Sequence, residues 1–263
     1  MPRCLGIRFA SCAAAVAAAA LLAPAPTSAA DYGDVTGKVV LDGEAPELEP
    51  RVEKGAAVKD AATCSVDAVP NFSLVVGEGN GIANVFLYPA RPIRGTKPEL
   101  EDAPQDPIVF DQKGCVFKPH AVIVRTGQPL EMFNSDPVAH NVRFTSFGNP
   151  GINVTVPANA PPGSGKGVEV QFNRAQRVPI PALCDFHPWM KANWLVVDTP
   201  YAALTDENGE FTIEGLPVGK HTFIVWQESA GFLDRALTVD VKADEKTDLG
   251  ELKYKLSAFK NLK

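Results

Sequence analysis

After residue 30, apolar residues occur in short β-rich runs, and glycine, proline, asparagine or aspartate separates one run from the next. No long segment has the apolar period of an amphipathic helix. Short runs bounded by turn residues predict strands, and many such strands in succession are typical of sandwiches and barrels. The sequence therefore predicts an all-β chain. The runs are VTGKVVL, SLVVG, ANVFLYP, AVIVRTG, LEMFNS, HNVRF, WLVVD, FTIEGL, HTFIVWQ and LTVDVK.

Three stretches depart from this pattern. KGAAVKDAATC, residues 54–64, favours a short helix or a loop, and NAPPGSGKG, residues 159–167, predicts a loop, because its prolines and glycines cannot sustain a strand ladder. In VPIPAL, Pro181 lacks an amide hydrogen, so we expect an edge strand or an irregular approach there.

Residues 1–30 have a different composition from the remainder of the chain. Arg3 and Arg8 precede an apolar, alanine-rich run from Cys12 to Ala23, and small residues follow it. This order is typical of a secretory signal peptide, here with cleavage near Ala30. The alternative is a membrane anchor, but the run is shorter than the roughly 20 residues that span a bilayer. We expect a periplasmic or secreted protein.

Charge and cysteine content narrow the functions of the exported chain. The full sequence has a net charge of −6, and removing the two arginines of residues 1–30, which contain no acidic residue, leaves −6 − 2 = −8. Such a charge argues against nucleic acid as a partner. The three remaining cysteines are Cys64, Cys115 and Cys184, an odd number for an oxidising compartment. One of the three thiols needs a separate explanation.

The stretch CDFHPWM offers that explanation, since Cys184, His187 and Met190 follow one another at intervals of three residues. A tight loop can direct such side chains at one point, and thiolate, imidazole and thioether together suit copper. A second imidazole is available in FNSDPVAHNVRF, where His140 opens an alternating strand. Cysteine, two histidines and a distant axial methionine form the ligand set of copper electron-transfer centres.

Residues 105–198 resemble a cupredoxin of the amicyanin type, also found in methylamine utilisation proteins. The resemblance rests on CDFHPWM, which matches a CxxHPxM ligand loop, and on AHNVRF. It implies a Greek-key β-sandwich with one type 1 copper ion, bound by the ligand set His140, Cys184, His187 and Met190. It also implies that Asn141 ties the two ligand loops together. His187 is expected nearest the surface, beside Pro188 and Trp189, which would form the patch for electron transfer.

The two ends of the chain share a second pattern. DENGEFTIEGLPVGKHTFIVWQESAG, residues 206–231, resembles half of a carboxypeptidase regulatory-like domain, and the opening of that domain resembles VTGKVVLDGEAP and ANVFLYP far upstream. The resemblance implies one small sandwich from residues 31–100 and 199–255, interrupted by the copper domain, with a tail at 256–263. Insertion at a loop costs little chain entropy. The alternative is three sequential pieces without an interrupted domain.

The remaining cysteines and histidines receive simpler interpretations. Because export favours disulfides and copper would reserve Cys184, we expect Cys64 and Cys115 to be paired. His120, in GCVFKPH, is either a surface residue or an additional ligand, and His221, in an alternating strand, is expected to be structural.

These observations favour an exported one-electron carrier that exchanges electrons with protein redox partners, rather than an enzyme. The sequence has no HxH pairs of the multicopper oxidase type, no CxxCH for haem, and no second cysteine in the ligand loop as a CuA centre requires. Two alternatives remain open. One is a cell-surface binding or structural module with a vestigial metal site, and the other is a copper storage or delivery protein.

Overall fold

The computed structural model describes residues 1–2 and 32–262, so the predicted signal segment lies outside the described residues apart from its first two. The all-β prediction is confirmed. Helix in the described part is limited to short pieces, and none of its helices is long and apolar enough to cross a membrane. These pieces are α1 (Ala61–Cys64), η1 (Glu78–Asn80), η2 (Pro98–Leu100) and η3 (Leu256–Ala258).

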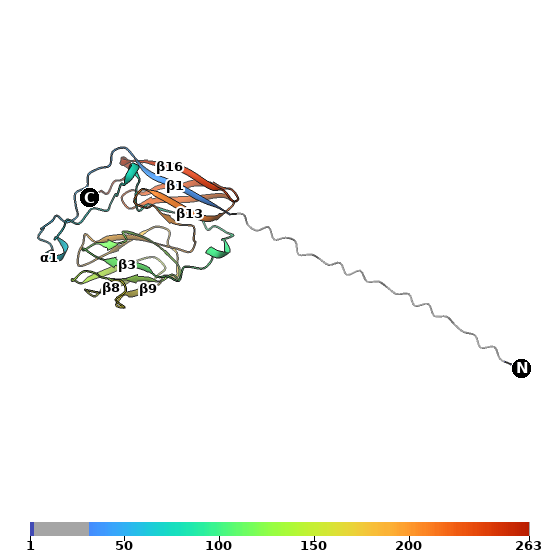
Figure 1. Cartoon of the computed structure of the whole chain (residues 1–263), viewed down its shortest axis with the longest axis horizontal. Coiled ribbons are helices and arrows are strands. Elements are labelled where there is room, and N and C mark those ends of the chain that lie inside the picture. Colours follow the sequence, from blue (N-terminus) through green and yellow to red (C-terminus); the bar gives the residue numbers. More distant parts are fainter. Residues whose placement is uncertain (3–31, 263) are drawn as a thin grey trace.

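Two stacked sandwiches make up the body of the molecule (Figure 1). The first has a five-stranded sheet in the order β5-β11-β10-β7-β8 and a four-stranded sheet in the order β4-β3-β6-β9. Its strands are β3 (Ile108–Gln112), β4 (Phe117–Lys118), β5 (Ala121–Arg125), β6 (Leu130–Met132), β7 (His140–Phe144), β8 (Ile152–Val156), β9 (Val168–Val170), β10 (Ile180–Leu183) and β11 (Lys191–Val197).

Trp194 is the centre of the first core. It is fully buried and contacts the rings of Phe110 and Phe144, whose centroids lie 4.8 and 4.9 Å away. Because these aromatic residues come from β11, β3 and β7, they join the two sheets of the sandwich. The predicted loop at residues 159–167 is confirmed, with one isolated bridge at Ala160.

Pro181 lies in an interior strand, where the sequence predicted an edge or an irregular approach. β10 pairs along its length with β11, including Pro181 opposite Asn193, but it pairs with β7 only at Leu183 opposite Arg143. The strand is therefore interior in position, while its pairing on the β7 side is reduced to the end next to Cys184.

The second sandwich combines segments from both ends of the described chain. A three-stranded sheet has the order β13-β1-β16, and a four-stranded sheet has the order β12-β2-β14-β15. Its strands are β1 (Tyr32–Asp42), β2 (Phe86–Pro89), β12 (Ala203–Leu204), β13 (Glu210–Pro217), β14 (Gly219–Gln227), β15 (Gly231–Val241) and β16 (Lys246–Lys255).

Strand pairing in this sandwich joins segments that lie before and after the first sandwich in the sequence. Val35 of β1 pairs with Ile213 of β13, and Leu87 of β2 pairs with Val225 of β14. Segments before and after the first sandwich therefore share sheets. The likeness to carboxypeptidase regulatory-like domains stays a prediction. Residues 256–262, predicted as a tail, pack on this sandwich, since Phe259 is buried in its core.

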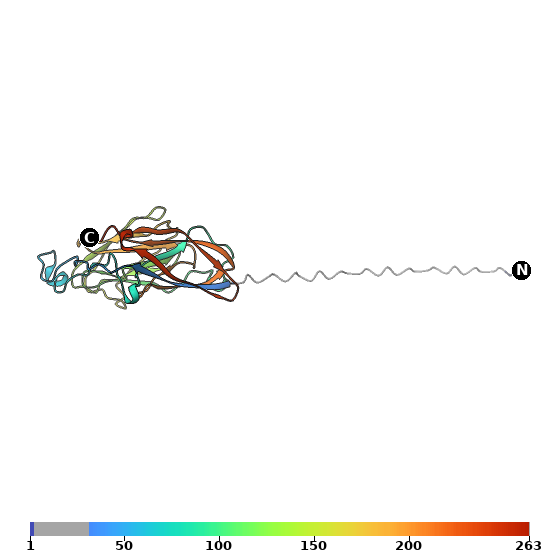
Figure 2. The same ribbon diagram turned by 90° about the horizontal axis from the view of Figure 1, so that it is seen from above.

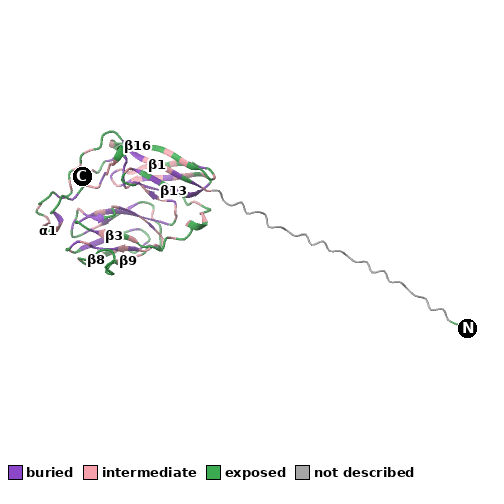
Figure 3. Ribbon diagram, in the orientation of Figure 1, coloured by how far each residue is buried: buried purple, intermediate pink, exposed green. Residues whose placement is uncertain are grey.

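The sandwiches share an apolar interface along β11. Every residue of this strand after Lys191 is buried, with Trp194 and Val196 facing the first core and Leu195 and Val197 facing Phe86 and Tyr88 of β2. A strand buried on both faces reads as a continuous apolar run, as WLVV does. Figure 3 shows this buried band in the middle of the molecule.

Residues 43–72, here called the cap segment, leave the second sandwich after β1 and extend to one end of the first (Figure 2). The segment is mostly irregular and contains α1, in agreement with the helix-or-loop prediction for residues 54–64. Cys64 forms a disulfide with Cys115 of the first sandwich, and Val52 bridges to Val69. The strand predicted at SLVVG, just beyond the segment, is wrong, because Val76 forms only an isolated bridge.

A substitution at Gly81 tests the close contact between the chain segments before and after the first sandwich. A Cβ atom at this position would overlap the carbonyl oxygen of Asn208, which is backbone and cannot move aside. We expect Gly81→Ala to reduce the free energy of unfolding by about 1–3 kcal/mol, the usual cost of overpacking. Denaturant unfolding measures the difference.

Gly151→Ala is the matched control, because a Cβ atom there would have no neighbour closer than 3.8 Å. Equal stability of the two variants would contradict the close contact between the chain segments at Gly81 and Asn208.

Candidate metal centre

His140 is the first residue of β7, and its position fixes one half of the site. The side chain is fully buried, and its Nε2 atom lies 2.9 Å from Oδ2 of Asp136. The same carboxylate accepts hydrogen bonds from the backbone amides of Gly114 and Cys115, at 2.6 and 2.8 Å. These bonds orient the imidazole so that its Nδ1 atom points away from Asp136.

The loop between β10 and β11 supplies the other half. The amide of Cys184 donates to the carbonyl of Met190, and the amide of Met190 donates to the carbonyl of His187, so the loop closes on itself. Cys184, His187 and Met190 are all buried, with exposed fractions of 3%, 0% and 1%. The tight turn that the three-residue intervals predicted is therefore present.

The two halves meet at three donor atoms. The Nδ1 atoms of His140 and His187 are 2.9 Å apart, Sγ of Cys184 is 3.8 Å from Nδ1 of His187, and all three lie within 4.8 Å of one another. A metal ion at about 2.0 Å from each nitrogen and about 2.3 Å from the sulfur separates such donors by about 3.3–3.7 Å. The sulfur–nitrogen distance is close to this range, whereas the two nitrogens are about 0.4 Å closer than it, so an ion bound here would have to move the two imidazoles slightly apart. Met190 lies in the same buried cluster as Cys184.

Protonation in the site favours a thiolate. Burial alone would raise the pKa of Cys184, but its contacts with the imidazoles of His140 and His187 and its hydrogen bonds with the backbone amides of Asn141 and His187 bring it down to about 6. Burial alone would lower the pKa of His140, yet the bonds to Asp136 and Cys184 raise it above its ordinary value. A proton held between the imidazoles therefore balances the thiolate charge, and a metal cation would replace that proton.

Asn141 connects the two ligand-bearing segments directly. Its Oδ1 atom accepts a hydrogen bond from the amide of Asp185 at 2.7 Å, and its Nδ2 atom donates to the carboxylate of Asp185 at 2.9 Å. Arg143 also binds that carboxylate at 2.7 Å. The residue next to His140 thereby fixes the residue next to Cys184.

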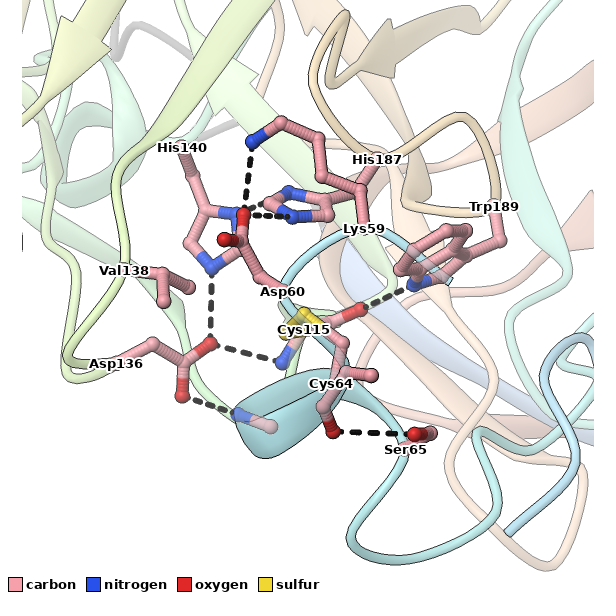
Figure 4. The surroundings of a disulfide bond; sticks show 12 residues. Lys59, Asp60, Cys64, Ser65, Cys115, Asp136, Val138, His140, His187 and Trp189 are labelled. Atoms are coloured by element: carbon pink, nitrogen blue, oxygen red, sulfur yellow. Dashed lines mark hydrogen bonds and ion pairs between the residues drawn. A yellow bond between two sulfur atoms is a disulfide. The ribbon is translucent and has the colours of Figure 1, made fainter. Parts of the chain in front are cut away.

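Two carboxylates that sequence reasoning missed complete the surroundings of the site (Figure 4). Asp136 binds Nε2 of His140, and Asp60, from the cap segment, binds Nε2 of His187 at 2.9 Å. The DP dipeptide four residues before His140 could have indicated Asp136, since it shares the FNSDPVAHNVRF stretch. No sequence signal connects Asp60 to His187, which is 127 residues away.

The expectation that His187 lies nearest the surface is wrong. Its side chain is fully buried because Asp60 and the cap segment cover the imidazole edge. Next to it, Pro188 is exposed and Trp189 is partly buried, with the indole Nε1–H group donating to the carbonyl of Cys115. Phe186, which was not predicted, is 36% exposed.

Within residues 32–262, the other cysteines and histidines have structural partners. Cys64 and Cys115 form the disulfide, with their Cα atoms 5.2 Å apart, so the sulfur of Cys115 cannot join Asp136 and His140 in a metal site. His120 matches neither prediction, because its largely buried ring binds Glu228 at 2.7 Å, away from the donor atoms. His221 lies 2.6 Å from the carbonyl of Pro217, a structural contact.

Comparison with known proteins gives partial structural matches alone. No family model matches the chain, and no curated protein matches it. An amicyanin from Paracoccus versutus is 17% identical over 44% of this chain and 99% of its own, with a TM-score of 0.29. A purple cupredoxin from Nitrosopumilus maritimus is 17% identical over 34% of this chain and 99% of its own, with a TM-score of 0.27.

A copper-containing nitrite reductase from Thermus scotoductus SA-01 is 18% identical over 35% of this chain, with a TM-score of 0.28. The match spans 22% of the reductase chain. These TM-scores and identities are too low to support a conclusion about the metal content or function of this protein. Such conclusions have to come from the geometry of the site.

The pKa of Cys184 gives a direct test of the site without metal. We expect the ultraviolet absorption of its thiolate to appear with a midpoint near pH 6, because the site lowers the pKa of this thiol from its ordinary value of 9.0 to about 6. The disulfide removes Cys64 and Cys115 from this titration. A spectroscopic pH titration of the metal-free protein measures the midpoint.

Cys184→Ser is the control and should lack the step. A midpoint close to the ordinary value in the native protein would show that the imidazoles do not stabilise the thiolate.

Proposed function

We propose that this protein is an exported type 1 copper protein that carries single electrons between protein partners. The observation that supports the proposal most is the convergence of two imidazole nitrogens and one thiolate in a buried site, with a methionine beside them. Trigonal His₂Cys sites with a weak axial methionine are the ligand sets of copper electron-transfer centres.

The residues around the site have distinct roles in this proposal. His140, Cys184 and His187 would hold one copper ion, with Met190 as the weak axial ligand, and bound copper would supply a one-electron couple between Cu(I) and Cu(II). Asn141 keeps the two ligand-bearing segments in register, so the donors change little between redox states. The burial of all four ligands excludes water from the site.

Burial also favours electron transfer over the alternatives. A copper storage or delivery protein exchanges its metal with partners and needs accessible donors, whereas here the donors are at most 3% exposed. A structural module with a vestigial site has no need to keep the complete donor set together. We infer no enzymatic step, because the proposed ligands leave no position for a substrate.

The location of the protein and the kind of partner it contacts are also part of the proposal. We propose a periplasmic or secreted protein, on the basis of the sequence pattern in residues 1–30. The surface formed by Pro188 and Trp189 is proposed to contact a protein redox partner. Because Trp189 contacts the ring of His187, with centroids 5.2 Å apart, it lies beside the donors.

Substitution of the ligands tests the proposal. On addition of copper, the native protein should develop an intense visible band that arises from the thiolate. Cys184→Ser should lose the band even if some copper stays bound, because a hydroxyl cannot replace the soft sulfur. Met190→Gln should keep a coloured site and shift its reduction potential, since the axial ligand is weak. Visible spectroscopy and a redox titration measure both effects.

His221→Gln serves as the control, because His221 lies outside the donor cluster. An unchanged copper spectrum and potential in Cys184→Ser would remove the basis of the electron-carrier function.

A further inference from the structure

The cap segment closes the one imidazole edge that the first sandwich leaves uncovered. His187 projects from the loop between β10 and β11, and its ring lies between two groups. Its Nδ1 atom faces Sγ of Cys184 at 3.8 Å, and its Nε2 atom faces Oδ2 of Asp60 at 2.9 Å. The ring is fully buried although Asp60 itself is 32% exposed. Asp60 therefore separates His187 from solvent.

Three attachments hold Asp60 in place. The Nζ atom of Lys59 contacts its carboxylate at 2.8 Å. The disulfide between Cys64 and Cys115 fastens the following helical turn to the first sandwich. Val58 packs against the apolar cluster that includes Val116 and Trp189. The carboxylate position is thus set by residues of the cap segment and by the covalent link together.

The hydrogen bond has a chemical consequence for the ligand. A carboxylate beside Nε2 accepts a hydrogen bond from the N–H group at that nitrogen, so the other nitrogen, Nδ1, faces Cys184 and His140. Asp136 does the same for His140. The two imidazoles are therefore oriented by two carboxylates, one from the first sandwich and one from the cap segment.

We propose that Asp60 is a positioning residue of the metal centre, which fixes the tautomer and orientation of His187 and closes its imidazole edge to solvent. The proposal rests on the copper site of the proposed function for its effect on potential, but not for its effect on the metal-free protein. The negative charge of the Asp60 carboxylate beside Nε2 would favour the more positive state of a bound metal, so Asp60 would also lower the reduction potential.

Two substitutions at this position separate orientation from charge. Asp60→Ala removes both the acceptor and the charge, whereas Asp60→Asn keeps an oxygen that can accept from Nε2 and removes the charge alone. Asp67→Asn is the matched control, because Asp67 also lies in the cap segment and also pairs with a lysine, Lys54, but its side chain is 85% exposed.

In the metal-free protein, nitrogen NMR of the imidazoles reports which nitrogen of His187 carries the proton. We expect the proton on Nε2 in the native protein, in Asp60→Asn and in Asp67→Asn, and a mixture of tautomers in Asp60→Ala. Alkylation of Cys184 by iodoacetamide should be several-fold faster in Asp60→Ala than in Asp67→Asn, because the His187 ring would no longer be held over the sulfur.

With copper bound, the potential should rise in both Asp60 variants, and Asp60→Ala should lose about 10–100-fold in copper affinity. Unchanged His187 protonation and unchanged alkylation in Asp60→Ala would overturn the proposal. If Asp60→Ala does not fold, Asp60→Asn decides through its potential: a rise supports the role and an unchanged value overturns it. If the native protein takes up no copper, the proposed function fails while the metal-free measurements still decide the role of Asp60.

Discussion

The contact between the Nδ1 atoms of His140 and His187 is the constraint on which the site depends. Two nitrogens 2.9 Å apart in a fully buried position cannot both be unprotonated acceptors, so a proton or a metal cation has to lie between them. The thiolate of Cys184 and the carboxylates of Asp60 and Asp136 supply compensating negative charge. The hydrogen bonds of Asp136 with His140 and of Asp60 with His187 orient both imidazoles so that their Nδ1 atoms can hold a cation in this position.

Sequence reasoning succeeded where function depends on local spacing. The intervals in CDFHPWM predicted a closed loop with three buried donors, and the alternation in HNVRF placed His140 at a strand start. Likewise, alternation predicted most of the strands. It failed at SLVVG, where Val76 forms only an isolated bridge with Ile82, a few residues further along the chain, and no continuous ladder.

Long-range contacts explain the remaining errors. The cupredoxin resemblance implied that His187 lies nearest the surface, but the group that covers it comes from residue 60. Nothing in the irregular, alanine-rich stretch around Asp60 has a periodicity that indicates where it packs. His120 was misread for the same reason, because its partner Glu228 belongs to the other sandwich and is 108 residues away.

The second sandwich stabilises the ligand loop as well as enclosing it. Glu228, in the turn between β14 and β15, binds His120, Lys191 and Asn193, and Lys191 directly follows Met190. Although burial raises the pKa of Glu228, its hydrogen bond with His120 and the charges of His120 and Lys191 bring it down to about 2. The carboxylate therefore stays ionised at neutral pH, where it keeps its contacts with Lys191 and Asn193 of β11. Asp60 of the cap segment contacts His187 in the loop, and Glu228 contacts Lys191 at the end of the loop, so residues outside the first sandwich hold the loop at two points. These two residues lie before and after the first sandwich in the sequence, so both flanking parts of the chain contribute contacts that fix the loop.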